Sequence, residues 1–101
     1  MMTENLFQDR EMLASLCRRH AIRRLSLFGS ILKGTAGPES DVDLLVEFVP
    51  GSEPGLLRLA KIEAELSALL GGRRVDLRTP RDLSPHFRSE VLHDAALQYA
   101  A

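Results

Sequence analysis

The segment of residues 41–48 places the strongest limit on how this chain can fold. Apolar and mainly polar residues alternate along it, with Val42, Leu44, Val46 and Phe48 interleaved with Asp41, Asp43, Leu45 and Glu47. Successive side chains of a β-strand point to opposite faces of the sheet. The pattern therefore predicts a strand over residues 41–48 that directs the first set into a core and both aspartates to the opposite face.

Hydrophobic periodicity and the positions of Gly and Pro predict further elements around this strand. Helices are expected over residues 4–20, over residues 56–70 and from Ser84-Pro85 onward; strands are expected over residues 22–28 and 73–78. Residues 31–34 suit a short helical turn and residues 35–40 a loop, whereas residues 96–99 suit either an edge strand or a tail. This order predicts an α+β (α/β) fold, with a small mixed β-sheet flanked by helices.

The apolar positions of these elements form the candidate core. Leu13, Leu16, Cys17 and His20 recur at helical spacing in the first predicted helix, and Leu56, Leu59, Ile62, Leu66, Leu69 and Leu70 do so in the second. Gly71-Gly72 supply the positive φ that commonly ends a helix. In the third predicted strand Val75 and Leu77 share the core face, so Arg74, Asp76 and Arg78 point the other way.

Length and charge restrict the class of protein. A chain of 101 residues has room for one domain, expected over residues 1–101, and the net charge of −1 argues against duplex DNA as a partner. Cys17 is the single cysteine, so an intramolecular disulfide and a cysteine-based zinc site are excluded. Neither a signal-peptide pattern nor an apolar run long enough for a membrane span is found, so we expect a cytoplasmic protein without a membrane partner.

Three features of the middle of the chain indicate chemistry. Gly29-Ser30 follows an apolar strand, where free N–H groups and a hydroxyl can meet an anion, although this pair alone favours an ordinary strand-to-helix turn. Asp41 and Asp43 lie about 7 Å apart along one face of a strand, where their repulsion favours divalent cations between them unless the face is simply solvated. Asp76 joins this pair if its strand is a neighbour.

Two other phosphate-binding motifs fail on this sequence. Gly29 and Gly34 have the spacing of a P-loop, but Thr35 stands where that motif requires lysine. A dinucleotide-binding G-x-G-x-x-G fingerprint is also absent from the sequence. Neither a P-loop nor a Rossmann site is therefore expected.

Gly29-Ser30, nine intervening residues and then Ser40-Asp41-Val42-Asp43-Leu44 resemble the G-S-x(9)-S-D-x-D-[LIV] signature of DNA polymerase beta-like nucleotidyltransferases. The short chain, the helix before the motif and the later Val75-Asp76-Leu77 are similar to the minimal nucleotidyltransferases (MNT) paired with HEPN-domain toxins. The resemblance covers nearly the whole chain.

The resemblance implies a role for each matching residue. Gly29, Ser30, Lys33 and Ser40 would bind the nucleotide, and Asp41, Asp43 and Asp76 would be catalytic carboxylates that ligate two Mg²⁺ ions, with ATP as substrate. The family form x-Ala-Arg-Gly after Gly-Ser is here Ile31-Leu32-Lys33-Gly34. Lys33 keeps a positive charge for phosphate but lacks the bidentate fork of arginine.

The function that follows is a nucleotidyltransferase antitoxin. It would transfer AMP from Mg-ATP to a hydroxyl, expected to be a tyrosine, of a cognate HEPN toxin with which it forms a hetero-oligomer. The alternatives are a non-catalytic antitoxin that masks its toxin and a transferase for a small molecule. The arginine-rich stretch with Arg10, Arg18, Arg19, Arg23 and Arg24 is a candidate contact surface for the partner.

Overall fold

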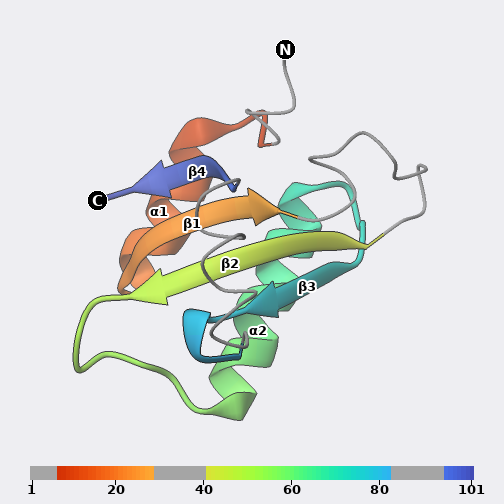
Figure 1. The fold of residues 1–101 in the computed structure, drawn as a ribbon. Helices are drawn as coiled ribbons and strands as arrows, with labels where there is room; N and C mark the ends of the chain where they lie inside the picture. The colour runs from red at the N-terminus through yellow and green to blue at the C-terminus, as the bar shows by residue number, and fades with distance from the viewer. Residues whose placement is uncertain (1–6, 29–40, 83–94) are drawn as a thin grey trace.

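The alternating segment forms the middle of the fold, as expected. The computed structural model describes residues 7–28, 41–82 and 95–101. Its elements are, in order, α1 (Arg10–Arg19), β1 (Ile22–Phe28), β2 (Val42–Phe48), α2 (Leu56–Leu69), β3 (Val75–Arg78), the 3-10 turn η1 (Pro80–Asp82) and β4 (Ala96–Ala100) (Figure 1).

The four strands form one mixed sheet in the order β3-β2-β1-β4. β1 is antiparallel to both β2 and β4, whereas β2 and β3 are parallel. The last segment of the chain is therefore a strand and not a tail, and the predicted α+β fold with a small mixed sheet is confirmed.

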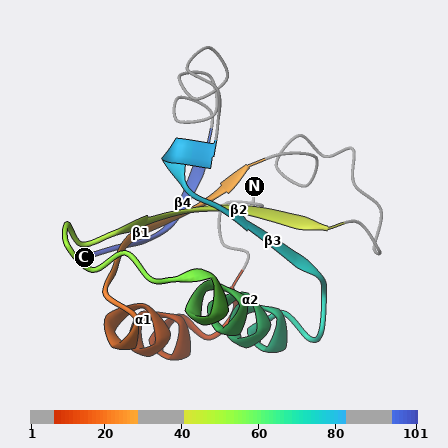
Figure 2. The same ribbon diagram turned by 90° about the horizontal axis from the view of Figure 1, so that it is seen from below.

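Both described helices cover the same face of this sheet (Figure 2). The core lies between the helices and the sheet, and the face of β2 that carries Val42, Leu44 and Val46 is fully buried in it. Leu13, Leu16 and Cys17 of α1 and Ile62 and Leu66 of α2 close the core from the other side. η1 lies on the opposite face of the sheet (Figure 2). No helix within the described ranges is long and apolar enough to cross a membrane.

The expected boundaries of three elements were wrong by a few residues. α1 begins at Arg10 and not at residue 4, because Asp9 adopts an extended conformation and its side chain accepts a hydrogen bond from the Met12 N–H, 3.0 Å away. The strand expected to begin at Asp41 begins one residue later, and the strand expected from Arg73 begins at Val75. Gly71 and Gly72 do end α2 at positive φ, as predicted.

One expected core position was also wrong. Leu56 shares the helical spacing of the buried leucines, yet it is 86% exposed in the first turn of α2, where the helix extends past the edge of the core. The predicted turn at 31–34, the loop at 35–40 and the helix from Ser84-Pro85 lie outside the described residues.

A polar contact joins the end of α1 to α2. His20, the C-cap of α1, is buried, and its Nε2 lies 2.7 Å from Oε1 of Glu65 on α2. This hydrogen bond, assisted by the charges of His20 and Arg19, holds the pKa of Glu65 below its usual value. The contact connects the two helices on one side of the core, in addition to their apolar packing.

We predict that Glu65→Ala lowers the free energy of unfolding by about 1 kcal/mol near pH 7, because it removes a hydrogen bond to a buried imidazole. The lowered pKa of Glu65 means that this contribution is present above the usual carboxyl pKa and is lost as the pH falls through the folded-state pKa. Urea unfolding of both proteins between pH 7 and pH 3 measures the difference. Glu53→Ala, at an exposed loop residue, is the control; equal losses in the two variants contradict the role of Glu65.

Candidate functional site

Asp43 and Asp76 lie side by side on the two parallel strands. In the β2–β3 ladder they are Cα partners, and the neighbouring pairs Val42↔Val75 and Leu44↔Leu77 are buried in the core. Alternation therefore places both carboxylates on the face of the sheet opposite α1 and α2. The sequence predicted that Asp76 joins Asp41 and Asp43 if its strand is a neighbour of theirs. β2 and β3 are neighbours.

Asp41 lies just before β2 and is the most exposed of the three carboxylates. The Arg74 Nε lies 3.9 Å from Asp41 Oδ1, and the two side chains are 81% and 48% exposed. The backbone beside them is fixed, because the Val42 N–H donates to the Arg74 carbonyl at 2.8 Å. Asp41 and Arg74 thus lie directly before the first residues of β2 and β3, next to the Asp43–Asp76 pair.

The surroundings of Asp43 disfavour the charged form of its carboxylate. Its pKa is raised, first because burial disfavours the charged carboxylate and then because Asp76 and Asp41 repel it, while Arg78 acts in the opposite direction. Asp76 is held by Arg78, whose Nη2 lies 3.2 Å from Asp76 Oδ2 and whose Nε lies 3.4 Å from the same atom. This hydrogen bond raises the pKa of Arg78.

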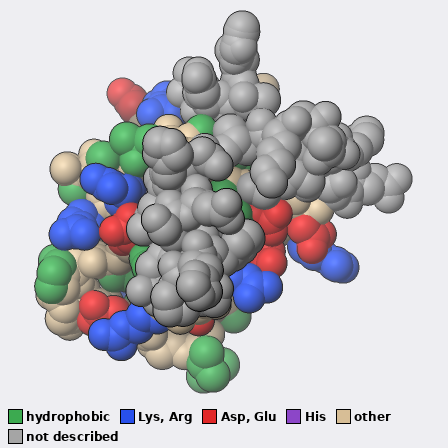
Figure 3. All heavy atoms as spheres, in the orientation of Figure 1, with side chains coloured by type: hydrophobic (Ala, Val, Ile, Leu, Met, Phe, Trp, Pro, Cys, Tyr) green, Lys and Arg blue, Asp and Glu red, His purple; other side chains and the backbone are tan. Residues whose placement is uncertain are grey.

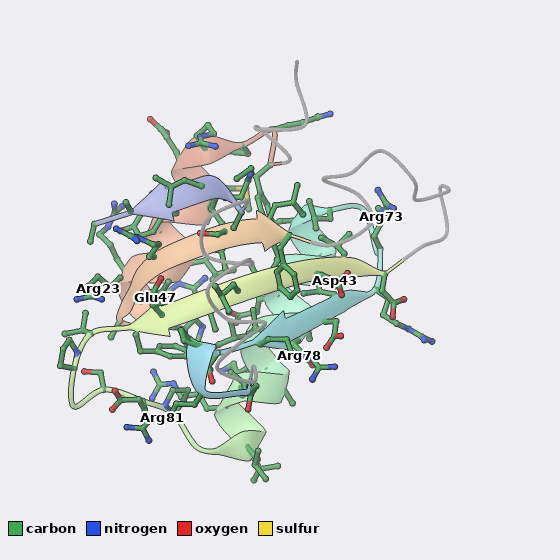
Figure 4. The ribbon with its side chains drawn as sticks, in the orientation of Figure 1. Arg23, Asp43, Glu47, Arg73, Arg78 and Arg81 are labelled. Atoms are coloured by element: carbon green, nitrogen blue, oxygen red, sulfur yellow. The ribbon has the colours of Figure 1, made fainter. Side chains whose placement is uncertain are left out.

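Acidic and basic side chains therefore adjoin at this end of the sheet (Figure 3). The labelled side chain of Asp43 lies toward the beginning of β2 and that of Arg78 belongs to the last residue of β3, whereas Arg23 and Glu47 lie toward the end of β2 (Figure 4). The sequence predicted that Arg74 and Arg78 share the strand face of Asp76; the structure pairs each of them with a carboxylate of the candidate site.

The donor chemistry of this group suits a divalent cation. Carboxylate oxygens are the ligands that Mg²⁺ prefers, and a cation would favour the charged form of Asp43, whose pKa is raised by burial and then by repulsion from Asp76 and Asp41. Within residues 7–28, 41–82 and 95–101, no three His, Cys, Asp or Glu side chains are gathered as a metal-binding group. A cation bound by Asp41 and Asp76 would compete with Arg74 and Arg78 for these carboxylates.

The predicted nucleotide-binding residues, Gly29, Ser30, Lys33 and Ser40, lie outside the described residues. The described chain still fixes where their segment is attached. β1 ends at Phe28, which is the Cα partner of Asp43, and β2 begins directly after Asp41. Both points of attachment are therefore at the end of the sheet that carries the carboxylates.

The sequence did not show that Leu45 is buried on the same face as Asp43. Leu45 is 1% exposed and packs against Phe28, in a cluster separate from the main core. Its position among polar residues of the alternating segment was the signal, since an apolar residue in a polar register marks a locally covered face. This cluster borders Asp43 and contributes to its low-dielectric surroundings.

Much of the arginine-rich stretch is paired within the protein. Arg19 lies 3.7 Å from Glu65, and Arg23 and Arg24 lie 3.4 and 4.0 Å from Glu47. All three arginines are more than half exposed, so these ion pairs are weak. The stretch as a contact surface for a partner stays a prediction.

Comparisons with known proteins agree on the family. A family model described as "Nucleotidyltransferase domain" matches residues 9–97. The protein adenylyltransferase MntA of Thermococcus cleftensis is 39% identical over 79 residues, which are 78% of this chain and 77% of that protein. A provisionally named protein adenylyltransferase of Methanocaldococcus jannaschii is 31% identical over 91 residues, or 90% of this chain and 95% of that one.

Solved structures share the fold. A provisionally named minimal nucleotidyltransferase superposes with a TM-score of 0.70 at 44% identity, covering 85% of each chain. A chain of a toxin-antitoxin crystal structure with AMP-PNP superposes with a TM-score of 0.70 at 21% identity, covering 92% of this chain and 74% of that one. The matched residues span both the strand pair with its carboxylates and the helices behind it, and this chain belongs to the nucleotidyltransferase domain family.

Proposed function

We propose that residues 1–101 form a single nucleotidyltransferase domain that transfers AMP from Mg-ATP to a hydroxyl of a protein. The observation that carries this proposal is the adjacency of Asp43 and Asp76 on β2 and β3, with Asp41 at the entry of β2. Burial and then repulsion by Asp76 and Asp41 raise the pKa of Asp43, and a bound cation would favour its charged form. Cys17, buried and with a pKa raised to about 12, takes no part in the reaction.

Asp41, Asp43 and Asp76 would hold two Mg²⁺ ions, which when bound supply charge neutralisation for the transferring phosphoryl group. Strand pairing fixes the backbone positions of Asp43 and Asp76 on the same face of the sheet, and Arg78 also holds the carboxylate of Asp76. Gly29, Ser30, Lys33 and Ser40 would bind the triphosphate. In the reaction the acceptor hydroxyl releases its proton to solvent and its oxygen bonds to the α-phosphorus. The bond from that phosphorus to the bridging oxygen breaks, and pyrophosphate leaves with the electron pair.

The acceptor we propose is a tyrosine of a HEPN-domain toxin in the cytoplasm, which would make this chain an antitoxin. Relatives at 31% and 39% identity are named as protein adenylyltransferases, and structures with the same fold come from toxin-antitoxin complexes, one with AMP-PNP. Two alternatives make different predictions. A masking antitoxin forms the complex without transferring AMP, whereas a small-molecule transferase acts without a protein partner.

The first test is the conversion of Asp43 to Asn. We expect Asp43→Asn to lower adenylyl transfer about a hundredfold or more, because it removes a charge that the reaction requires. The variant should be as stable as the wild type or more stable near pH 7. The raised pKa of Asp43 means that its charged form disfavours folding, an effect that grows as the pH rises through that pKa and disappears below the usual carboxyl pKa.

Transfer is measured with labelled ATP, and stability by thermal unfolding without Mg²⁺. Asp9→Asn is the matched control, since asparagine also caps a helix and Asp9 lies at the start of α1. Wild-type transfer by Asp43→Asn at saturating Mg-ATP would refute the assigned role.

Mg²⁺ binding has a readout that does not depend on activity. A ligand that binds only the folded state raises the melting temperature in proportion to the logarithm of its concentration above Kd. We expect Mg²⁺ to raise the melting temperature of the wild type and of Asp9→Asn, and to do so much less in Asp43→Asn and Asp76→Asn. An equal rise in all four proteins would mean that Mg²⁺ binds elsewhere.

The acceptor is tested by incubating the protein with labelled ATP, Mg²⁺ and the HEPN-domain protein encoded by the adjacent gene. We expect label on a tyrosine of that protein, an increase of its mass by one AMP, and loss of its toxicity. A tight complex without label favours the masking antitoxin. Label on a small molecule with no protein acceptor favours the third function.

A further inference from the structure

A pocket lies at the opposite end of β2 from the carboxylates. Its volume is about 410 Å³, and its lining includes Val46, Glu47 and Phe48 of β2 together with Pro54, Leu59 and Arg81. Three consecutive strand residues line it, although neighbouring residues of a strand point to opposite faces. The pocket therefore lies along the edge of β2, where side chains of both faces and the backbone between them are accessible.

The strand pairing explains why this edge has no strand partner among the described residues. β2 pairs with β1 from Asp43 to Phe48, but its pairing with β3 ends at Leu45↔Arg78. The chain then turns away into η1, which is fastened by Asp82 Oδ2 accepting hydrogen bonds from the Thr79 N–H at 3.0 Å and the Thr79 hydroxyl at 3.2 Å. Within the described residues, no strand is paired with residues 46–48 on this side.

The direction of the backbone groups follows from the ladder. The Val42 N–H donates toward β3, to the Arg74 carbonyl, and backbone groups alternate in direction along a strand. The N–H and C=O groups of Phe48 therefore point toward the pocket side of β2. An edge of this kind is suited to receive an extended chain as an added strand.

The lining offers carboxylates to a basic side chain. Glu47 is already held by Arg23 and Arg24, at 3.4 and 4.0 Å, whereas Glu53 and Asp82 form no ion pair within the described residues. These two carboxylates can attract a basic segment. In Figure 4, Arg23 and Glu47 lie at the end of β2 and Arg81 lies on the η1 side.

Exposed apolar side chains adjoin the pocket. Leu56 is 86% exposed, one helical turn before the pocket-lining Leu59, and Leu57 is 91% exposed beside it. Two leucines this exposed at the start of a helix extend the apolar surface beyond the pocket. A partner larger than a single peptide can bury them.

We propose that an extended basic segment of the protein acceptor binds along the edge of β2 in this pocket, and that the same partner covers Leu56. The proposal rests on the proposed function and adds to it the surface that recognises the acceptor. Val46 lies three residues from Asp43 on β2, about 10 Å along the strand. A few extended residues span this distance, so a segment anchored in the pocket can bring a hydroxyl to the carboxylates.

The test uses the full chain and the HEPN-domain protein encoded by the adjacent gene. Glu53→Lys and Leu56→Ser change exposed residues of the proposed surface, and Glu11→Lys and Leu97→Ser make the same chemical changes at exposed residues of α1 and β4. We expect each of the first two variants to weaken the complex about tenfold or more in Kd. The control variants should bind as the wild type does, and Mg-ATP should bind equally to all five proteins.

Hydrogen exchange of the Phe48 amide, followed by NMR in the free protein and in the complex, gives the second readout. We expect the complex to slow the exchange of this amide. Unchanged exchange, absence of a complex, or equal losses in the variants and their controls would overturn the docking proposal. Slowed exchange without AMP transfer would refute the proposed activity and leave the docking surface standing, whereas transfer with unchanged exchange would do the reverse.

Discussion

The position of β2 between an antiparallel and a parallel neighbour determines most of what this protein can do. In one row across the sheet, Phe28 of β1 pairs with Asp43 of β2, and Asp43 pairs with Asp76 of β3. Side chains alternate along each strand, so a slip of one residue in either pairing would move a carboxylate into the core. The burial of Val42, Leu44, Val75 and Leu77 prevents such a slip, and the apolar core thereby sets the geometry of the charged site.

The placement of both described helices on one face has an electrostatic consequence. α1 and α2 bury one side of the sheet and the carboxylates lie on the other side, so charge and main core are separated by the thickness of the sheet (Figure 2). Asp43 nevertheless lies beside buried Leu45 and close to two like charges. The folded protein tolerates an ionised Asp43 because the core on the other face offsets its cost, and Arg78 reduces that cost from the same face.

The sequence predicted those parts of the fold that depend on strong periodicity. β1 has the expected bounds, β2 and β3 have the expected faces, and Cys17 and His20 are buried as their spacing indicated. The boundaries and the exposed positions that were predicted wrongly depend on local interactions. The Asp9 cap stops α1 from extending toward the N-terminus, and Leu56 projects past the core despite its helical spacing. The His20–Glu65 hydrogen bond joins residues 45 positions apart, and no local pattern reveals a contact of that range.

For the candidate site, the sequence indicated the three carboxylates, and the structure showed which residues lie beside them. The parity of β2 and β3 was readable, but their adjacency was not, because it depends on the crossover through α2. The length of β3 was equally hidden. β3 ends at Arg78, so the second half of β2 has a partner only in β1 among the described residues. The same short strand that places Asp76 beside Asp43 thus leaves the edge near Phe48 without a paired strand in the described part of the chain. Catalytic carboxylates and a surface able to receive an extended chain can therefore arise from a single feature of the topology.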